Sequence, residues 1–139
     1  MTEISGAYLL EIAKQLSFIA ALLGGLSGAL MGALLFSRSD SPAVKWALFS
    51  AATATCAFIV SVVALTMLIV GLNPSAPESL VTQAGLLQAR SIGTFGFFLG
   101  LYGTLFTIGA CGWVRSRRMG VATTILAGAA CIATTRCLI

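Results

Sequence analysis

Four stretches of this chain hold no charged side chain for 17 residues or more, and they constrain its fold more than any other feature. They are Leu16–Phe36, Trp46–Leu72, Ser91–Trp113 and Met119–Thr135. A helix needs about 20 apolar residues to cross the hydrocarbon core of a bilayer. The first three stretches are long enough. The fourth is shorter, and it requires the Arg136 side chain to reach an interface.

The composition agrees with a lipid-facing chain. Charged residues make up 9% of the sequence and hydrophobic residues 58%, whereas a soluble domain has about 25% charged residues. We therefore predict an all-α polytopic membrane protein. Residues 1–139 form a single domain, a four-transmembrane-helix bundle with Gly/Ala/Ser-rich faces. The predicted spans are about 16–36, 46–72, 91–113 and 119–136.

Two of these helices are predicted to extend beyond the membrane at their N-terminal ends. Ser75 and Glu78 have the spacing of a capping box, and Pro77 suits a first helical turn, so the third helix is expected from about residue 77. The first helix is expected from about residue 6. The alternative is that each extension is an amphipathic segment on the membrane surface. The leader carries Glu3 and Glu11, so we expect no cleaved signal peptide.

The basic residues predict an orientation. The two short connections, residues 37–45 and 114–118, contain Arg38, Lys45, Arg115, Arg117 and Arg118. The opposite side would hold Lys14, Arg90 and Arg136. Because Lys and Arg favour cytoplasmic loops, we expect both connections in the cytoplasm and both termini outside. The predicted location is a bacterial cytoplasmic (inner) membrane.

Small residues recur along the apolar stretches at helical spacing. In the first stretch they are four residues apart, and in the third the spacing alternates between three and four, which puts them on one helix face. We predict that these glycines pack helices together, as a glycine zipper: Gly24, Gly28, Gly32, Gly93, Gly96, Gly100 and Gly103. Two interpretations remain open, namely packing within one chain and contact between subunits.

Residue types that carry chemistry are scarce. The chain has no His, no ionisable residue in the central part of any apolar stretch, and four cysteines without a C-x-x-C motif. We therefore predict no catalytic, cofactor-binding or metal site and no enzymatic activity. The net charge of +4 forms no basic stripe, so no nucleic-acid partner is expected.

Hydroxyl groups are the main polar groups inside the stretches. They can bond within and between helices, or they can line a pore. The members of this set are Ser50, Thr53, Thr55, Ser61, Thr66, Thr94, Thr104 and Thr107.

The sequence predicts a non-enzymatic membrane protein that self-associates and has a pore-like or structural role. Its expected partners are membrane lipid and either copies of itself or other membrane subunits. One alternative is an accessory or scaffolding subunit of a larger membrane complex. A second alternative is a small-molecule carrier.

Overall fold

The computed structural model describes residues 6–36, 41–73 and 83–138, and every element of regular structure in these ranges is a helix. The helices are α1 (Gly6–Leu35), α2 (Pro42–Gly71), α3 (Gln83–Arg115) and α4 (Arg117–Leu138). All four are long and apolar enough to cross a membrane. The all-helical prediction is confirmed. The predicted helix start near residue 77 and the side chain of Arg38 lie outside the described residues.

Local sequence signals explain where two of the helices begin. Ser41 is the N-cap of α2, where its side chain accepts a hydrogen bond from the Val44 amide, and Pro42 occupies the first turn. Ser116 alone separates α3 from α4, and its hydroxyl accepts a hydrogen bond from the Met119 amide. The chain therefore reverses direction within a very short turn.

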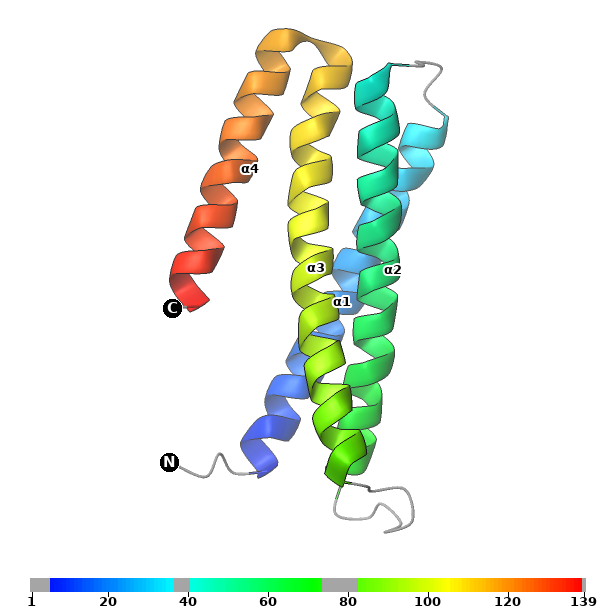
Figure 1. Ribbon diagram of the computed structural model, residues 1–139, viewed down its shortest axis with the longest axis vertical. Coiled ribbons are helices and arrows are strands. Elements are labelled where there is room, and N and C mark those ends of the chain that lie inside the picture. The colour runs from blue at the N-terminus through cyan, green and yellow to red at the C-terminus, as the bar shows by residue number, and fades with distance from the viewer. Residues whose placement is uncertain (1–5, 37–40, 74–82, 139) are drawn as a thin grey trace.

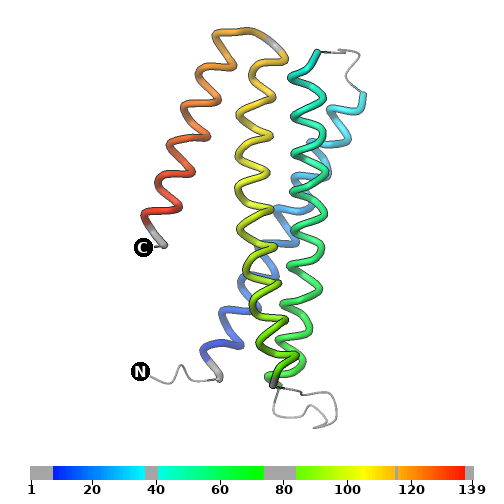
Figure 2. The backbone as a smooth tube through the Cα atoms, in the orientation of Figure 1, coloured from blue at the N-terminus to red at the C-terminus, as the bar shows by residue number. Residues whose placement is uncertain are grey.

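The four helices alternate in direction along the long axis of the molecule. The end of α1, the start of α2 and the turn between α3 and α4 lie at one end. The start of α1 lies at the other end, together with the end of α2 and the start of α3 (Figure 2). Lys45, Arg117 and Arg118 therefore share one end of the protein, and Arg115 ends α3 beside them.

The helices α1, α2 and α3 form the packed body of the protein. The helix α2 packs along both α3 and α1, while α1 crosses behind them obliquely and has few contacts with α3 (Figure 1). The core consists of small side chains around one large one. Ala20, Ala47, Ala51 and Ala54 are fully buried, and so is Phe58.

The helix α4 stands apart from this body. It packs along α3 and has at most a marginal contact with any other described helix (Figure 1). Only 6% of the residues in its apolar window are buried, against 33% in α2 and in α3. The four helices therefore do not close around a common axis.

Candidate functional site

The α3 glycines that we selected from the sequence lie against α2. A Cβ atom added to Gly96 would lie 3.0 Å from the backbone oxygen of Ala57, and one added to Gly103 would lie 3.1 Å from the Ala54 Cβ. At Gly93 the nearest atom would be Leu65 Cγ at 3.0 Å, and at Gly100 it would be a ring carbon of Phe58 at 2.8 Å. These four contacts are all within the chain.

The α1 glycines differ from one another. A Cβ atom at Gly24 would lie 3.0 Å from the Phe58 Cβ, whereas one at Gly28 would have ordinary contact, 3.9 Å, with Thr55 Cγ2. At Gly32 no heavy atom lies within 4 Å. The close approach between α1 and α2 is therefore centred near Gly24, and Gly32 faces open space.

Buried hydroxyl groups link the three packed helices. Ser27 of α1 hydrogen-bonds Thr104 of α3 at 2.7 Å, with both side chains buried. Ser50 of α2 donates to the Gly103 carbonyl at 2.8 Å and accepts from Thr107 at 3.0 Å. Every buried side-chain nitrogen and oxygen in the described part of the chain has a partner.

Other hydroxyls bond to helix backbone. Ser61 of α2 donates across the interface to the Gly93 carbonyl at 2.7 Å. Thr53, Thr55 and Thr66 each donate to the carbonyl four residues earlier in their own helix. The bonds of these three threonines therefore stay within α2, whereas that of Ser61 joins two helices. Ser27 is an interhelical partner that was not predicted from the sequence.

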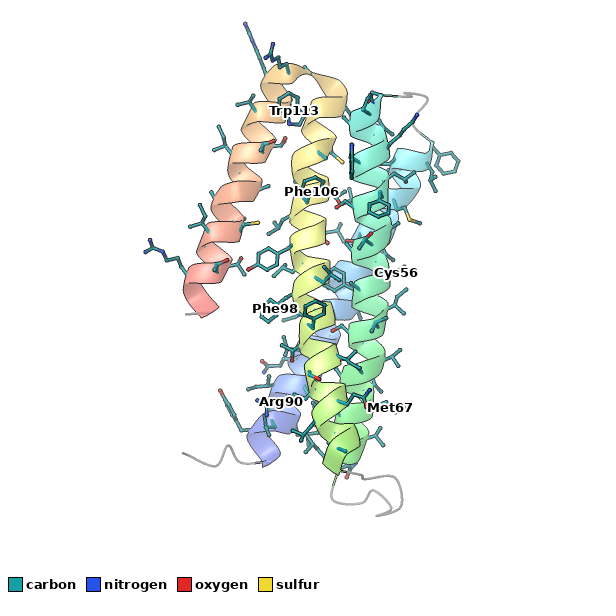
Figure 3. All side chains as sticks on the ribbon, viewed as in Figure 1. Cys56, Met67, Arg90, Phe98, Phe106 and Trp113 are labelled. Atoms are coloured by element: carbon teal, nitrogen blue, oxygen red, sulfur yellow. The ribbon has the colours of Figure 1, made fainter. Side chains whose placement is uncertain are left out.

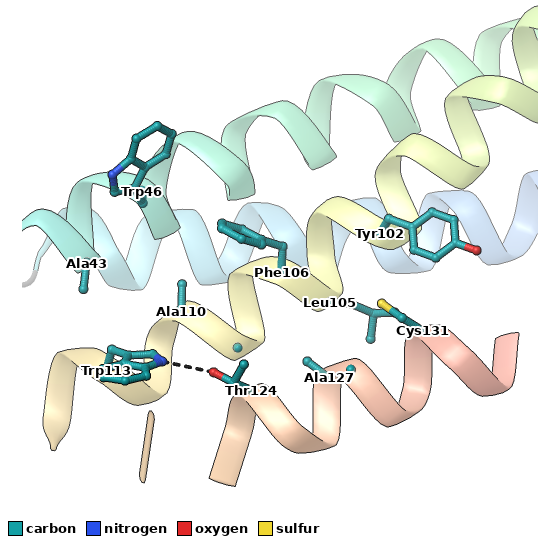
Figure 4. A pocket seen from close by; sticks show the side chains of 12 residues that line it. Ala43, Trp46, Tyr102, Leu105, Phe106, Ala110, Trp113, Thr124, Ala127 and Cys131 are labelled. Atoms are coloured by element: carbon teal, nitrogen blue, oxygen red, sulfur yellow. Dashed lines mark hydrogen bonds between the residues drawn. The ribbon is translucent and has the colours of Figure 1, made fainter. Parts of the chain in front are cut away.

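An apolar groove of about 730 Å³ lies between α2, α3 and α4. Trp46 comes from α2, while Tyr102, Phe106 and Trp113 come from α3, and Cys131 belongs to the α4 wall (Figure 4). The full lining is Ala43, Trp46, Tyr102, Leu105, Phe106, Gly109, Ala110, Trp113, Thr124, Ala127, Gly128 and Cys131. The groove could not be predicted from the sequence, because an apolar lining has no motif.

Three interhelical hydrogen bonds join α4 to α3 along this groove. Trp113 Nε1 donates to Thr124 Oγ1 at 3.0 Å (Figure 4), and Thr123 Oγ1 donates to the Gly109 carbonyl at 3.0 Å. Further along, the hydroxyls of Tyr102 and Thr135 are hydrogen-bonded at 3.0 Å. These three bonds fix the register between the two helices.

The same register places the end of α4 beside the middle of α3. Tyr102 is the central residue of the charge-free stretch Ser91–Trp113, and Arg90 and Trp113 lie toward opposite ends of α3 (Figure 3). Thr135 is bonded to Tyr102, so Arg136 also lies near the middle of this stretch. Each end of this stretch is about 16 Å from Tyr102 along α3, at 1.5 Å per residue.

The charge-free stretch of α2 runs beside that of α3, since Ser50 and Ser61 bond Gly103 and Gly93 of α3. The placement of Arg136 on the same side of the membrane as Lys14 and Arg90 stays a prediction.

The described residues contain no group of three or more His, Cys, Asp or Glu side chains that could hold a metal ion. Cys56, Cys111 and Cys131 are free thiols. The absence of catalytic and cofactor sites remains a prediction from the sequence.

Four helices long and apolar enough to span a bilayer, with an all-helical fold, define the class as an all-helical polytopic membrane protein. The chain matches no protein-family model, no curated protein and no solved structure. Its function is therefore argued from its own residues.

Proposed function

We propose that this chain is a non-enzymatic membrane protein with a structural role, which it performs by associating with other transmembrane helices in the bilayer. One observation carries the proposal. The helix α4 packs along α3 alone and leaves most of its surface, with the adjoining groove, open within the membrane. Helices associate in lipid through close packing and polar contacts, and an open helix beside a groove offers both.

The positions of the hydroxyls favour the structural role over a pore. A pore without charged rings needs hydroxyl or carbonyl groups along its lining. Ser27, Ser50, Ser61, Thr104 and Thr107 are instead buried and hydrogen-bonded between helices. A pore formed by several copies would have to be lined by other residues.

The glycines are proposed as helix-packing residues of the same protein. Support comes from the distances at Gly93, Gly96, Gly100 and Gly103, where a methyl group would meet α2 at about van der Waals contact or closer. Because these faces are occupied within the chain, we propose that association with other subunits uses α4 and the groove. The proposed location is a bacterial cytoplasmic membrane with both termini outside.

The test is the size of the particle extracted from native membranes in mild detergent, followed by ion flux in liposomes. We expect a particle larger than one chain and no flux above empty liposomes. A monomer in every detergent that preserves native complexes would contradict the structural role. A defined ring of copies that conducts ions would favour the pore.

A further inference from the structure

The groove between α2, α3 and α4 begins at one end of the molecule. Trp46, in the second turn of α2, and Trp113, in the last turn of α3, both line it there (Figure 4). This is the end at which α3 turns into α4 (Figure 1). Further along, the lining reaches Tyr102 of α3 and Cys131 of α4. The groove therefore runs from an end of the molecule inward between the helices.

The length of the groove matches that of one lipid chain. Trp113 and Tyr102, both in the lining, are 11 residues apart, or about 16 Å at 1.5 Å per residue. The hydrocarbon core of a bilayer is about 30 Å thick, so the chains of one leaflet cover about 15 Å. A single acyl chain that enters at the tryptophans would therefore fill the groove along its length.

The hydroxyl groups in the lining already have partners. The Thr124 hydroxyl accepts from Trp113 Nε1 and donates to the Gly120 carbonyl. The Tyr102 hydroxyl is bonded to that of Thr135. The rest of the lining consists mainly of aliphatic, aromatic and glycine residues. An occupant therefore meets apolar surface, which suits a hydrocarbon chain.

Arg117 lies on the face of α4 that lines the groove. Arg117, Thr124, Gly128 and Cys131 follow one another at intervals of seven, four and three residues, which places them on one side of a helix. Arg117 is exposed and is the first residue of α4, so its charge lies at the end of the groove where the tryptophans are. Arg118 is exposed as well, but it lies about 100° further round the helix.

Among the described residues, the charges at this end are all positive. Lys45, Arg117 and Arg118 are exposed there, whereas Glu11, the acidic residue of the described ranges, is in the second turn of α1 toward the opposite end (Figure 2). Asp40 lies outside the described residues. An apolar groove that begins beside a guanidinium group is complementary to an amphiphile with a hydrocarbon chain and an anionic head.

We propose that this groove binds an anionic phospholipid, with one acyl chain between the helices and the phosphate beside Arg117. Basic pockets between transmembrane helices bind anionic headgroups in this way. The inference goes beyond the proposed function, since a lipid held there would form part of the surface that another subunit meets.

The two tryptophans of the chain are the probe for this lipid, because both line the groove. The full-length protein is reconstituted in phosphatidylcholine vesicles with a small fraction of either phosphatidylglycerol or phosphatidylcholine that has brominated acyl chains. Bromine quenches tryptophan fluorescence only at close range, so quenching reports which lipid lies in the groove. We expect an apparent affinity about fivefold higher for phosphatidylglycerol, the usual contribution of one basic residue beside anionic lipid.

Three variants test the position of the charge. Arg117→Gln should remove the preference for phosphatidylglycerol, and Arg117→Lys should keep it. Arg118→Gln is the matched control, because it removes an equal charge from the next residue, away from the groove face. Equal quenching by both lipids in the unchanged protein overturns the proposal. An equal loss in Arg117→Gln and Arg118→Gln also overturns it, since the attraction would then belong to the basic end in general.

A further variant tests the groove itself. Gly128 is in the lining, and a Cβ atom added there would have no heavy atom within 4 Å, so a larger side chain fits without a clash. Gly128→Leu should occupy the space of the acyl chain and weaken quenching by brominated phosphatidylglycerol. Gly32→Leu adds the same group at an equally open position on α1 and should leave quenching unchanged. Unchanged quenching in Gly128→Leu contradicts the groove as the site.

Two results would assign the groove to another occupant and overturn the proposal. Displacement of brominated phosphatidylglycerol by oleate, but not by unlabelled phosphatidylglycerol, would assign it to a fatty acid. A Gly128→Leu protein that loses its native assembly while lipid quenching stays the same would assign it to a helix of another subunit. Loss of the lipid preference alone leaves the size of the native particle unchanged, so the proposed function is judged separately.

Discussion

At Gly96, one added methyl group would meet the backbone of α2. The new Cβ would lie 3.0 Å from the Ala57 oxygen and 3.3 Å from the Ser61 Cβ. Backbone atoms cannot rotate away as a flexible side chain can, so the helices must separate. We expect Gly96→Ala to lower the free energy of unfolding by about 1–3 kcal/mol, the usual cost of overpacking, as measured by titration with SDS in mixed micelles.

Gly32→Ala is the matched control for this change. It adds the same methyl group to an apolar helix where no atom lies within 4 Å. Ala is also the better helix former, by up to about 1 kcal/mol in water. The control should therefore be neutral or slightly stabilising. Equal effects at Gly96 and Gly32 would mean that the spacing of small residues on α3 has no role in packing.

The individual residue contacts could be predicted from the sequence only in part. The spacing of Gly93, Gly96, Gly100 and Gly103 places them on one face of a helix, since that follows from 3.6 residues per turn. Spacing cannot say that Ser27 meets Thr104, because an interhelical pair depends on the crossing point and register of two helices. Those are set by the packing of many side chains at once.

Among the elements, α4 has the weakest hold on the rest of the protein. It has one packed neighbour, and Gly120 supports it by lying against the Trp113 ring, where any Cβ would be within 3 Å of the ring carbons. Segments with few buried contacts open at low free-energy cost. We expect the amides of α4 to exchange with deuterium faster than those of α2 in the same detergent micelle, as measured by mass spectrometry of peptic fragments.

The Thr123→Val variant tests the same attachment of α4, because the side chain keeps nearly the same shape and loses only its hydroxyl. It removes the hydroxyl that donates to the Gly109 carbonyl, and interhelical bonds of this kind contribute about 0.6 kcal/mol on average in membranes. Exchange in α4 should rise by a factor of about 2 to 3, with no change in α1. Protection of α4 equal to that of α2 in the unchanged protein would contradict the loose attachment.

The number of helices could be predicted from the sequence, but the attachment of α4 could not. The number of helices follows from the runs without charge, since hydrocarbon excludes ionised groups over about 20 residues. Which neighbour a helix packs against does not follow from its hydropathy, because lipid is as apolar as a core. Thus the four-helix composition was predictable, whereas the isolation of α4 was not.

At the scale of the whole molecule, the two ends differ in their basic residues. The end where α2 begins and α3 turns into α4 has Lys45, Arg117 and Arg118, and Arg115 ends α3 there. Lys14 and Arg90 lie toward the opposite end. This difference favours a cytoplasmic basic end, since the bias in Lys and Arg sets the orientation of membrane proteins.

Two single-cysteine variants in a background without native cysteines test this orientation in sealed inverted and right-side-out vesicles. Ser116→Cys lies in the exposed turn between α3 and α4, and Tyr8→Cys lies on the exposed first turn of α1 at the opposite end. A membrane-impermeant maleimide should label residue 116 only in inverted vesicles and residue 8 only in right-side-out vesicles. The reverse pattern would place the basic end outside the cell. Labelling of both positions from the same side would contradict the antiparallel arrangement itself, because α1 and the α3–α4 turn would then no longer lie at opposite faces of the membrane.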